Sequence, residues 1–222
     1  MVIILFGPPG AGKGTQANLL AQHLALPRIV TGDLFREAIA SDDALGKQVK
    51  PHLERGELVP DQLTIALVVE RLQRADCVSG VVFDGFPRTV AQAQWFDREL
   101  KKRRRGVDSV VNLVVSDEEI FHRLAGRLIC SGCQRTYHAI AMQPEKLGRC
   151  DHCGGELIQR TDDSSEAIPV RLRAYREQTE PVLTYYRAKG LVVDVDGEAQ
   201  AEAVQQDILD SLPLALLSAA EG

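Results

Sequence analysis

The sequence predicts an α/β fold in which a doubly wound sheet of five parallel strands is covered by helices on both faces. Two observations favour this fold. Short apolar runs rich in β-branched residues recur along the chain, and helical patterns separate them. Strands that are apolar throughout and alternate with helices are typical of a parallel sheet buried on both faces. The expected strands are residues 2–6, 28–31, 81–84, 109–115 and 191–195.

Helical patterns fill most of the intervals between these strands. Two stretches do not fit the alternation: residues 33–60 are helical and polar, and residues 129–163 are rich in turn-forming glycine and proline. Each predicts a small lobe inserted into the core domain. We expect a core of residues 1–29, 60–126 and 164–222, a first lobe of 30–59 and a second lobe of 127–163. The expected helices are 14–24, 63–74, 90–100, 169–187 and 199–212.

Composition narrows the class of protein. The 222 residues are 45% hydrophobic, which is enough for one sizeable core with small additions. The net charge of −5 gives no sign of a nucleic-acid partner, and the basic run at 101–105 is interpreted as a solvated helix end. The apolar start of the chain is too short for a signal peptide or a membrane span. A soluble, cytoplasmic protein is expected.

The residues after the first expected strand carry the strongest chemical signal. Residues 7–15 read Gly-Pro-Pro-Gly-Ala-Gly-Lys-Gly-Thr and open a helix, which is the setting of a phosphate-binding loop. Glycines let successive N–H groups point inward, and the helix N-terminus adds positive potential. Lys13 can reach the β- and γ-phosphates. Gly14 stands where Ser or Thr is usual, so the hydroxyl for phosphate or magnesium is supplied by Thr15. The pattern predicts the core of a P-loop NTPase.

Four of the five cysteines form two Cys-x-x-Cys pairs separated by sixteen residues. This spacing predicts one tetrahedral zinc held by Cys130, Cys133, Cys150 and Cys153. Four thiolates fill every coordination position of the metal, so this zinc is structural. A lobe of this size has a small core and needs a bound metal to stabilise it. His138 and His152 are alternative ligands. The remaining Cys77 is interpreted as an inert thiol.

Three motifs together carry a family resemblance. Gly-Pro-Pro-Gly-Ala-Gly-Lys-Gly-Thr-Gln at 7–16, Thr-Gly-Asp-Leu-Phe-Arg at 31–36 and Asp-Gly-Phe-Pro-Arg-Thr at 84–89 resemble the adenylate kinase family. The resemblance runs from residue 2 to about residue 197. It implies a monomeric enzyme that transfers a phosphoryl group reversibly between ATP and AMP to give two ADP, with Mg²⁺ accompanying ATP. It also implies that the first lobe binds AMP and that the second is a zinc-bearing lid. Partners would be these nucleotides, with no nucleic acid and no membrane.

The resemblance also implies roles for individual residues. The catalytic groups would be Lys13, Arg88, Arg127, Arg160 and Arg171. Magnesium would be held through water by Asp84 and Asp33, although either carboxylate would also suit a turn or helix cap. ATP would contact Gly10, Ala11, Gly12, Lys13, Gly14, Thr15, Arg123, Arg127, Thr136, Tyr137 and Ala199. AMP would contact Thr31, Arg36, Glu57, Leu58, Val59, Gly85, Phe86, Pro87, Arg88, Gln92, Arg160 and Arg171.

One segment departs from the family pattern. Residues 167–170 read Ala-Ile-Pro-Val where a Thr-Val-Arg type of run is common, so one ancillary arginine is absent and Arg173 is additional. The role of Arg171 is therefore assigned from its distance to residues 175–179. No role follows for the tail at 212–222.

Two other functions compete with this interpretation. The first is another nucleoside monophosphate kinase, acting on UMP, CMP or GMP; the long lid and the pairing of Thr31 with Gln92 favour adenine. The second is a nucleotide-dependent switch or a nucleic-acid-binding module with a zinc ribbon. The sequence has no Asn-Lys-x-Asp guanine motif and no clustered basic and aromatic surface.

Overall fold

The computed structural model describes the whole chain except residues 43, 56, 134, 160–162, 165 and 214–222. Its centre is a five-stranded sheet in the order β2-β3-β1-β4-β8, and every neighbouring pair is parallel. This confirms the predicted fold class. The strands are β1 (Val2–Phe6), β2 (Arg28–Val30), β3 (Val81–Asp84), β4 (Ser109–Val114) and β8 (Val192–Asp196). Each lies within two residues of its predicted bounds.

Two helical layers cover the sheet, because successive side chains of a strand point to opposite faces. In β1, Ile3 and Leu5 pack with apolar residues of α1 (Lys13–His23) and α9 (Ala201–Ser211). Val2, Ile4 and Phe6 pack with the other layer, so β1 is buried on both sides. That layer consists of α4 (Asp61–Leu72), α5 (Val90–Lys102) and α8 (Glu180–Arg187).

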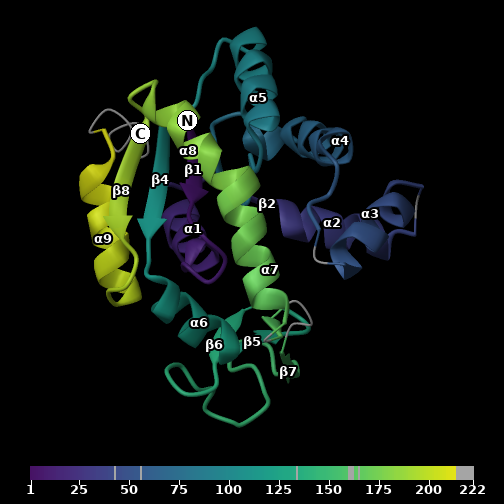
Figure 1. Ribbon diagram of the computed structural model, residues 1–222, viewed down its shortest axis with the longest axis vertical. Helices are drawn as coiled ribbons and strands as arrows, with labels where there is room; N and C mark the ends of the chain where they lie inside the picture. Colours follow the sequence, from purple (N-terminus) through teal and green to yellow (C-terminus); the bar gives the residue numbers. More distant parts are fainter. Residues whose placement is uncertain (43, 56, 134, 160–162, 165, 214–222) are drawn as a thin grey trace.

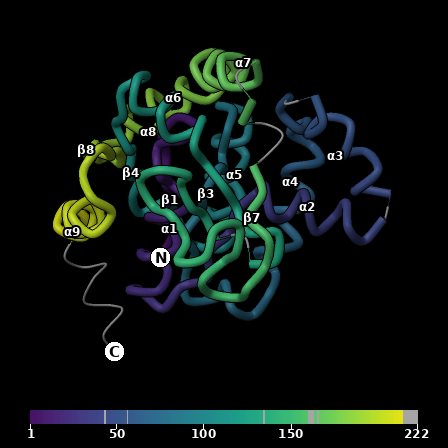
Figure 2. The backbone as a smooth tube through the Cα atoms, turned by 90° about the horizontal axis from the view of Figure 1, so that it is seen from below, coloured from purple at the N-terminus to yellow at the C-terminus, as the bar shows by residue number. Residues whose placement is uncertain are grey.

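A helical hairpin projects from the edge of the sheet after β2. It consists of α2 (Thr31–Ala40) and α3 (Ala44–Glu54), which lie on the opposite side of the sheet from α9 (Figures 1 and 2). Phe35 of α2 and Val49 of α3 are buried in the same apolar cluster, which continues into the core. Strand β2 ends one residue before its predicted end because Thr31 already begins α2.

A second small sheet follows α6 (Asp117–Ala125) and lies at the lower end of the molecule in Figure 1. It is antiparallel, in the order β6-β5-β7, with strands β5 (Arg127–Cys130), β6 (Thr136–His138) and β7 (Leu157–Ile158). Its buried cluster holds little apolar surface beyond Tyr137 and Leu157. The boundaries expected for the core and the two lobes stay predictions.

The chain returns to the core through one long helical path. It runs from α7 (Ala167–Ala174) through a π-helical turn at Tyr175–Thr179 into α8. The sequence predicts an uninterrupted helix over 169–187. Pro181 explains the wider turn, because it lacks an N–H group and its ring would clash with the carbonyl of residue 177 in a regular α-helix. No helix in the described part of the chain is long and apolar enough to cross a membrane.

Candidate nucleotide site

The loop at residues 7–15 joins β1 to α1 and is shaped by glycines. Gly10 and Gly12 have φ of 86° and 90°, values that side chains with a Cβ rarely adopt. Lys13 folds back over the loop, and its Nζ donates hydrogen bonds to the carbonyls of Gly7 and Pro8, each at 2.8 Å. Burial lowers the pKa of Lys13 to about 8, and nearby arginines add to this, whereas Asp84 opposes it. The N-terminus of α1 and this partly buried ammonium group together favour a bound anion.

Two cavities meet at this loop. The first cavity lies between the loop, the α2–α3 hairpin and residues 85–88 that follow β3. The second lies between the loop, α6, the small antiparallel sheet and residues 197–201 that follow β8. Lys13, Arg88 and Arg171 line both cavities. Two anionic ligands could therefore bind with their charged ends at one shared, cationic wall.

Gly85 anchors the wall of the first cavity. Its carbonyl accepts hydrogen bonds from Thr31 Oγ1 at 2.9 Å and from Arg88 Nε at 2.8 Å. Gly85 has a φ of 80°, and a Cβ there would lie 3.0 Å from both Thr31 Oγ1 and an Arg88 guanidinium nitrogen. Only glycine allows this close approach, which fixes the direction of the Arg88 side chain before a ligand binds.

Both the oxygen and the nitrogen of the Gln92 side-chain amide form hydrogen bonds within the protein. Its Oε1 accepts from the backbone N–H of Arg88 at 2.7 Å, and its Nε2 donates to Asp61 Oδ1 at 2.7 Å. Asp61 also accepts from Thr89 Oγ1 at 2.9 Å. Asp61 thus ties α4 to the start of α5 beneath Arg88. No sequence pattern indicates this role, since an acidic residue after Pro60 looks like any helix start.

Most residues expected at the acceptor site lie around the first cavity. Thr31, Val59 and Gln92 are buried and are not part of the cavity wall. Arg160 lies outside the described residues. The cavity is lined by Arg36, Glu57, Leu58, Gly85, Phe86, Pro87, Arg88 and Arg171.

The residues expected at the donor site all lie around the second cavity. Asp84 and Asp33, the expected magnesium carboxylates, also line it. Asp33 pairs with Arg36 and lies 3.7 Å from Arg28, so it is partly neutralised within the protein. The wall includes Gly10, Ala11, Gly12, Lys13, Gly14, Thr15, Arg123, Arg127, Thr136, Tyr137 and Ala199.

Two of the expected phosphate-binding arginines share one carboxylate. Arg127 donates to Asp163 through Nε and a terminal nitrogen, each at 2.6 Å, and Arg171 donates to the same carboxylate at 2.5 Å. The Asp163 side chain is fully buried. Arg123 likewise pairs with Glu119 at 2.6 Å. The sequence alone does not reveal the role of Asp163, because only the folded chain brings it to Arg127. Glu119 stands four residues before Arg123, so the i,i+4 spacing on a helix predicts their pairing.

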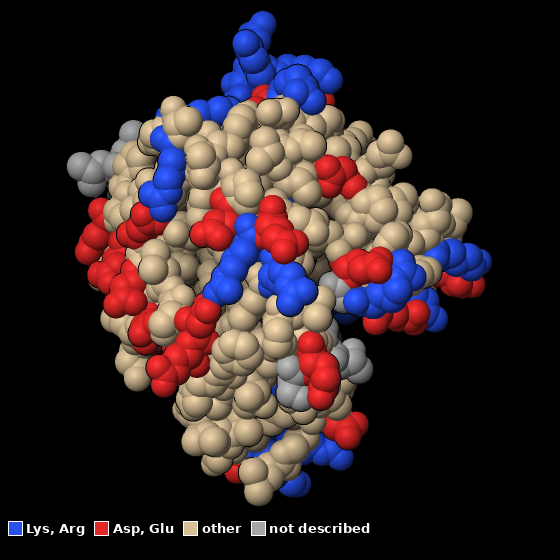
Figure 3. Space-filling view, in the orientation of Figure 1, with Lys and Arg blue, Asp and Glu red and all other residues tan. Residues whose placement is uncertain are grey.

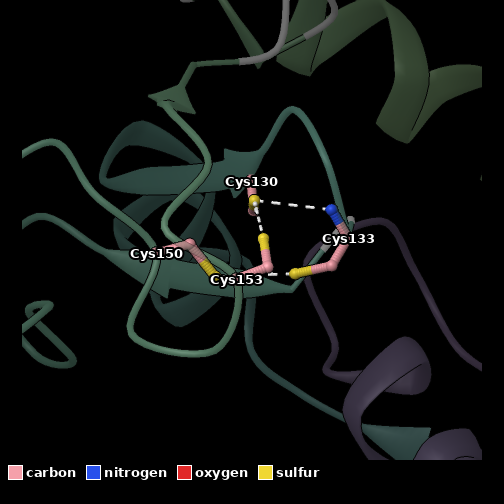
Figure 4. Close-up of side chains that lie close together, drawn as sticks. All are labelled: Cys130, Cys133, Cys150 and Cys153. Atoms are coloured by element: carbon pink, nitrogen blue, oxygen red, sulfur yellow. Dashed lines mark hydrogen bonds between the residues drawn. The ribbon is translucent and has the colours of Figure 1, made fainter.

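The four cysteines of the small sheet converge on a common centre (Figure 4). Their Sγ atoms all lie within 4.8 Å of one another, with Cys130–Cys153 at 3.4 Å and Cys133–Cys150 at 3.5 Å. Tetrahedral zinc with Zn–S bonds of about 2.3 Å places its sulfurs about 3.8 Å apart, so this donor set fits zinc.

The surroundings of the cysteines support the same metal. A hydrogen bond with the Tyr137 hydroxyl lowers the pKa of Cys150, and zinc binds the thiolate form. Contacts with the other thiols raise the pKa of Cys133. Neither histidine considered as an alternative ligand belongs to the cluster. His138 instead accepts hydrogen bonds at Nδ1 from the backbone N–H groups of Ile140 and Ala141.

The basic run at 101–105 lies at the end of α5, where Lys and Arg gather at the top of the molecule (Figures 1 and 3). Lys102 and Arg103 pair with Glu99. Arg105 donates to the backbone carbonyls of Met1 at 2.9 Å and Cys77 at 3.1 Å. These contacts support the interpretation of the basic run as a helix end, because its cationic side chains bind groups of the protein itself.

Comparison with known proteins gives a consistent picture. The sequence family described as adenylate kinase matches residues 5–191. A protein named adenylate kinase from Archaeoglobus fulgidus is 47% identical over 208 residues, which is 94% of this chain and 96% of the relative. One of the same name from Caldicellulosiruptor bescii is 44% identical over 212 residues, covering 96% and 99%. Another from Streptomyces avermitilis is 47% identical over 213 residues, covering 96% and 97%.

Proposed function

The chain belongs to the adenylate kinase family, and we propose that it catalyses the reversible transfer of a phosphoryl group from ATP to AMP, giving two ADP. The observation that carries this proposal is the pair of cavities that meet at Lys13, Arg88 and Arg171. ATP would occupy the second cavity and AMP the first. The γ-phosphate and the acceptor phosphate would then face each other across the shared cationic wall.

Catalysis in this proposal is positioning and charge stabilisation, because the transferring phosphoryl group requires little covalent chemistry from the protein. Lys13 and the N–H groups of the loop would hold the β- and γ-phosphates of ATP. Arg88, oriented by Gly85, would hold the phosphate of AMP. Arg127, Arg160 and Arg171 would surround the transferring group, and their planar guanidinium groups suit bidentate binding of phosphate.

The residues around Lys13 suit a magnesium ion that accompanies ATP. Asp84 lies beside the start of α1, since a Cβ on Gly14 would be 3.5 Å from Asp84 Oδ2. Oxygen donors of this kind, through water, are what Mg²⁺ prefers, and Asp33 is a second candidate. Bound magnesium would neutralise charge on the phosphates. Thr15, which also lines the second cavity, offers a hydroxyl.

Zinc in the four-cysteine cluster would be structural. Four thiolates leave no position open for water or substrate, so the metal would hold the small sheet together and take no part in the transfer. The lobe has a small buried cluster, which is consistent with a need for such a staple. We propose that this lobe closes over ATP as a body.

AMP is the proposed acceptor because the relatives that match this chain are named adenylate kinase. Thr31 and Gln92, the pair that the resemblance makes adenine-selective, stand beside Arg88 behind the cavity wall. UMP, CMP and GMP remain the alternative acceptors. A cytoplasmic location and a monomeric state stay predictions.

A direct test combines an activity assay with matched arginine variants. The purified protein with ATP, AMP and Mg²⁺ is expected to form ADP, and Arg88→Ala is expected to lower turnover by roughly 10³-fold or more. Arg98, exposed on α5 and outside both cavities, gives the control, and Arg98→Ala is expected to keep full activity. Near wild-type turnover in folded Arg88→Ala would contradict the proposed arrangement.

A further inference from the structure

Tyr175 lies at the point where the long helical path passes the first cavity. It is the first residue of the π-helical turn, and it lines the first cavity together with Ala174 and Thr179. Its ring packs against Phe6, with 6.2 Å between ring centroids. Phe6 is the last residue of β1 and directly precedes the phosphate-binding loop. Tyr175 is therefore fixed on one side by the core and faces the cavity on the other.

The hydroxyl of Tyr175 is uncommitted, unlike those of two other tyrosines on the same helical path. No described residue forms a hydrogen bond with it. By contrast, Tyr185 donates to Asp97 at 2.8 Å and Tyr186 lies 3.3 Å from the same carboxylate. Tyr175 is partly buried, and a tyrosine hydroxyl that is withdrawn from solvent normally has a partner. The first cavity is thus lined by a residue with a spare hydrogen-bond donor.

The ionisation of Tyr175 keeps that donor available. Burial raises its pKa above the ordinary value, with a smaller contribution in the same direction from Glu180. The phenol therefore retains its proton throughout the neutral range. A retained proton allows the group to donate to an anionic oxygen without the repulsion that a phenolate would bring.

The neighbours of Tyr175 define the ligand chemistry. Arg171 precedes it by four residues, so the two side chains leave the same face of the helix. Arg36 and Arg88 line the same cavity. Three guanidinium groups favour an anion with several acceptor oxygens, and a phosphate fits this set. Single π-helical turns within α-helices often occur at functional sites, and this one bears Tyr175 as its first residue.

We propose that the Tyr175 hydroxyl donates a hydrogen bond to a phosphate oxygen of the acceptor nucleotide, and that it thereby belongs to the acceptor-binding set with Arg36, Arg88 and Arg171. The inference rests on the proposed function, since it names a further contact of the same site. In this proposal, the π-helical turn holds the acceptor phosphate on the side of the first cavity that faces the phosphate-binding loop.

The test removes one oxygen atom. Tyr175→Phe keeps the ring and its packing on Phe6, and Tyr185→Phe is the matched control, because it removes a phenol hydroxyl of α8 that binds Asp97. For Tyr175→Phe we expect the KM for AMP to rise about tenfold, as for a lost hydrogen bond to a charged group, and the KM for ATP to stay within about twofold. Tyr185→Phe is expected to leave both values unchanged, and thermal melts would verify that both variants are folded.

Deoxynucleotides show whether the Tyr175 hydroxyl binds the phosphate or the ribose of AMP. If the hydroxyl binds phosphate, Tyr175→Phe raises the KM for AMP, 2′-deoxy-AMP and 3′-deoxy-AMP by the same factor. An effect that disappears with either deoxynucleotide assigns the contact to the ribose and overturns the proposal. An unchanged KM for AMP, or an equal rise for AMP and ATP, also overturns it. Failure of the proposed function would look different, because the wild-type protein itself would then form no ADP from AMP.

Discussion

Arg127 and Asp163 form a bidentate ion pair across the base of the small antiparallel sheet. Arg127 Nε and one terminal nitrogen each lie 2.6 Å from a different oxygen of the Asp163 carboxylate. The same carboxylate binds Arg171 of α7 at 2.5 Å. Asp163 thus joins the strand that enters the small sheet to the helix that leaves it, and it holds two cavity-lining arginines at a fixed separation.

Removing this carboxylate is expected to cost stability. Asp163→Ala leaves two partly buried guanidinium groups without their shared partner, so the free energy of unfolding should fall by about 3–5 kcal/mol. Glu54→Ala is the control, because its pair with Lys50 at 3.9 Å is largely exposed, and a change below about 0.5 kcal/mol is expected. Urea unfolding of both variants measures the difference. Equal changes in the two variants would show that Asp163 does not organise the arginines.

The pH dependence of ATP use follows from the partly buried ammonium group of Lys13. Burial lowers its pKa to about 8, so the free enzyme loses this positive charge as the pH rises through that value. We expect kcat/KM for ATP, which reports the free enzyme, to fall above about pH 8. The fall in kcat at saturating ATP should lie at higher pH, because bound phosphates stabilise the ammonium. Initial rates between pH 6 and 10 measure both profiles.

Lys13→Arg provides the control for this profile. A guanidinium group stays ionised throughout the range, so the variant, although slower, should show no fall near pH 8. A fall that persists unchanged in Lys13→Arg would assign the titration to another group.

The cysteine cluster gives a prediction about metal and stability. The wild-type protein is expected to bind one zinc per chain, and Cys133→Ser to lose it, with a fall in Tm of about 5–10 °C. Part of the activity should survive at low temperature, since Lys13 and Arg88 lie outside the small sheet. Cys77→Ser is the control, because Cys77 is buried away from the cluster and the variant should keep its zinc. Elemental analysis and thermal melts decide the matter, and a metal-free wild-type protein under reducing conditions would contradict the zinc assignment.

Asp61 is expected to affect the binding of AMP indirectly, through the residues that it holds in place. It holds Thr89 and Gln92, and Gln92 in turn holds the backbone of Arg88. Asp61→Ala should raise the KM for AMP about fivefold, as for one lost hydrogen bond, with little change for ATP. Glu70→Ala, at an exposed position of the same helix, should change neither. A comparable rise for both substrates would point to general loosening of the core.

The fold was predictable because its signals are local. Each strand of the parallel sheet is a short apolar run, and the glycine-rich loop carries its lysine within nine residues. The four cysteines were predictable for the same reason, since each Cys-x-x-Cys pair is contiguous. The π-helical turn at Tyr175–Thr179 was not foreseen, because the helical pattern continues through it and only Pro181 gives a hint.

The partners of the site residues were less predictable. Asp163 meets Arg127 across 36 residues and Asp61 meets Gln92 across 31, so both contacts depend on the packing of separate elements. A sequence pattern shows which cations and glycines are suited to phosphate. It does not show which carboxylate will hold each cation in place, because any of the 31 acidic residues could do so until the fold excludes most of them.

The choice of acceptor is the decisive property, and a nucleotide panel measures it. The purified protein would be given ATP and Mg²⁺ with AMP, UMP, CMP or GMP under identical conditions, and the initial rate of nucleoside diphosphate formation would be recorded. The site around Thr31, Arg88 and Gln92 predicts that kcat/KM is highest for AMP, by roughly a hundredfold over the other three. A higher value for UMP, CMP or GMP, or no diphosphate formed from AMP, would contradict the proposed function.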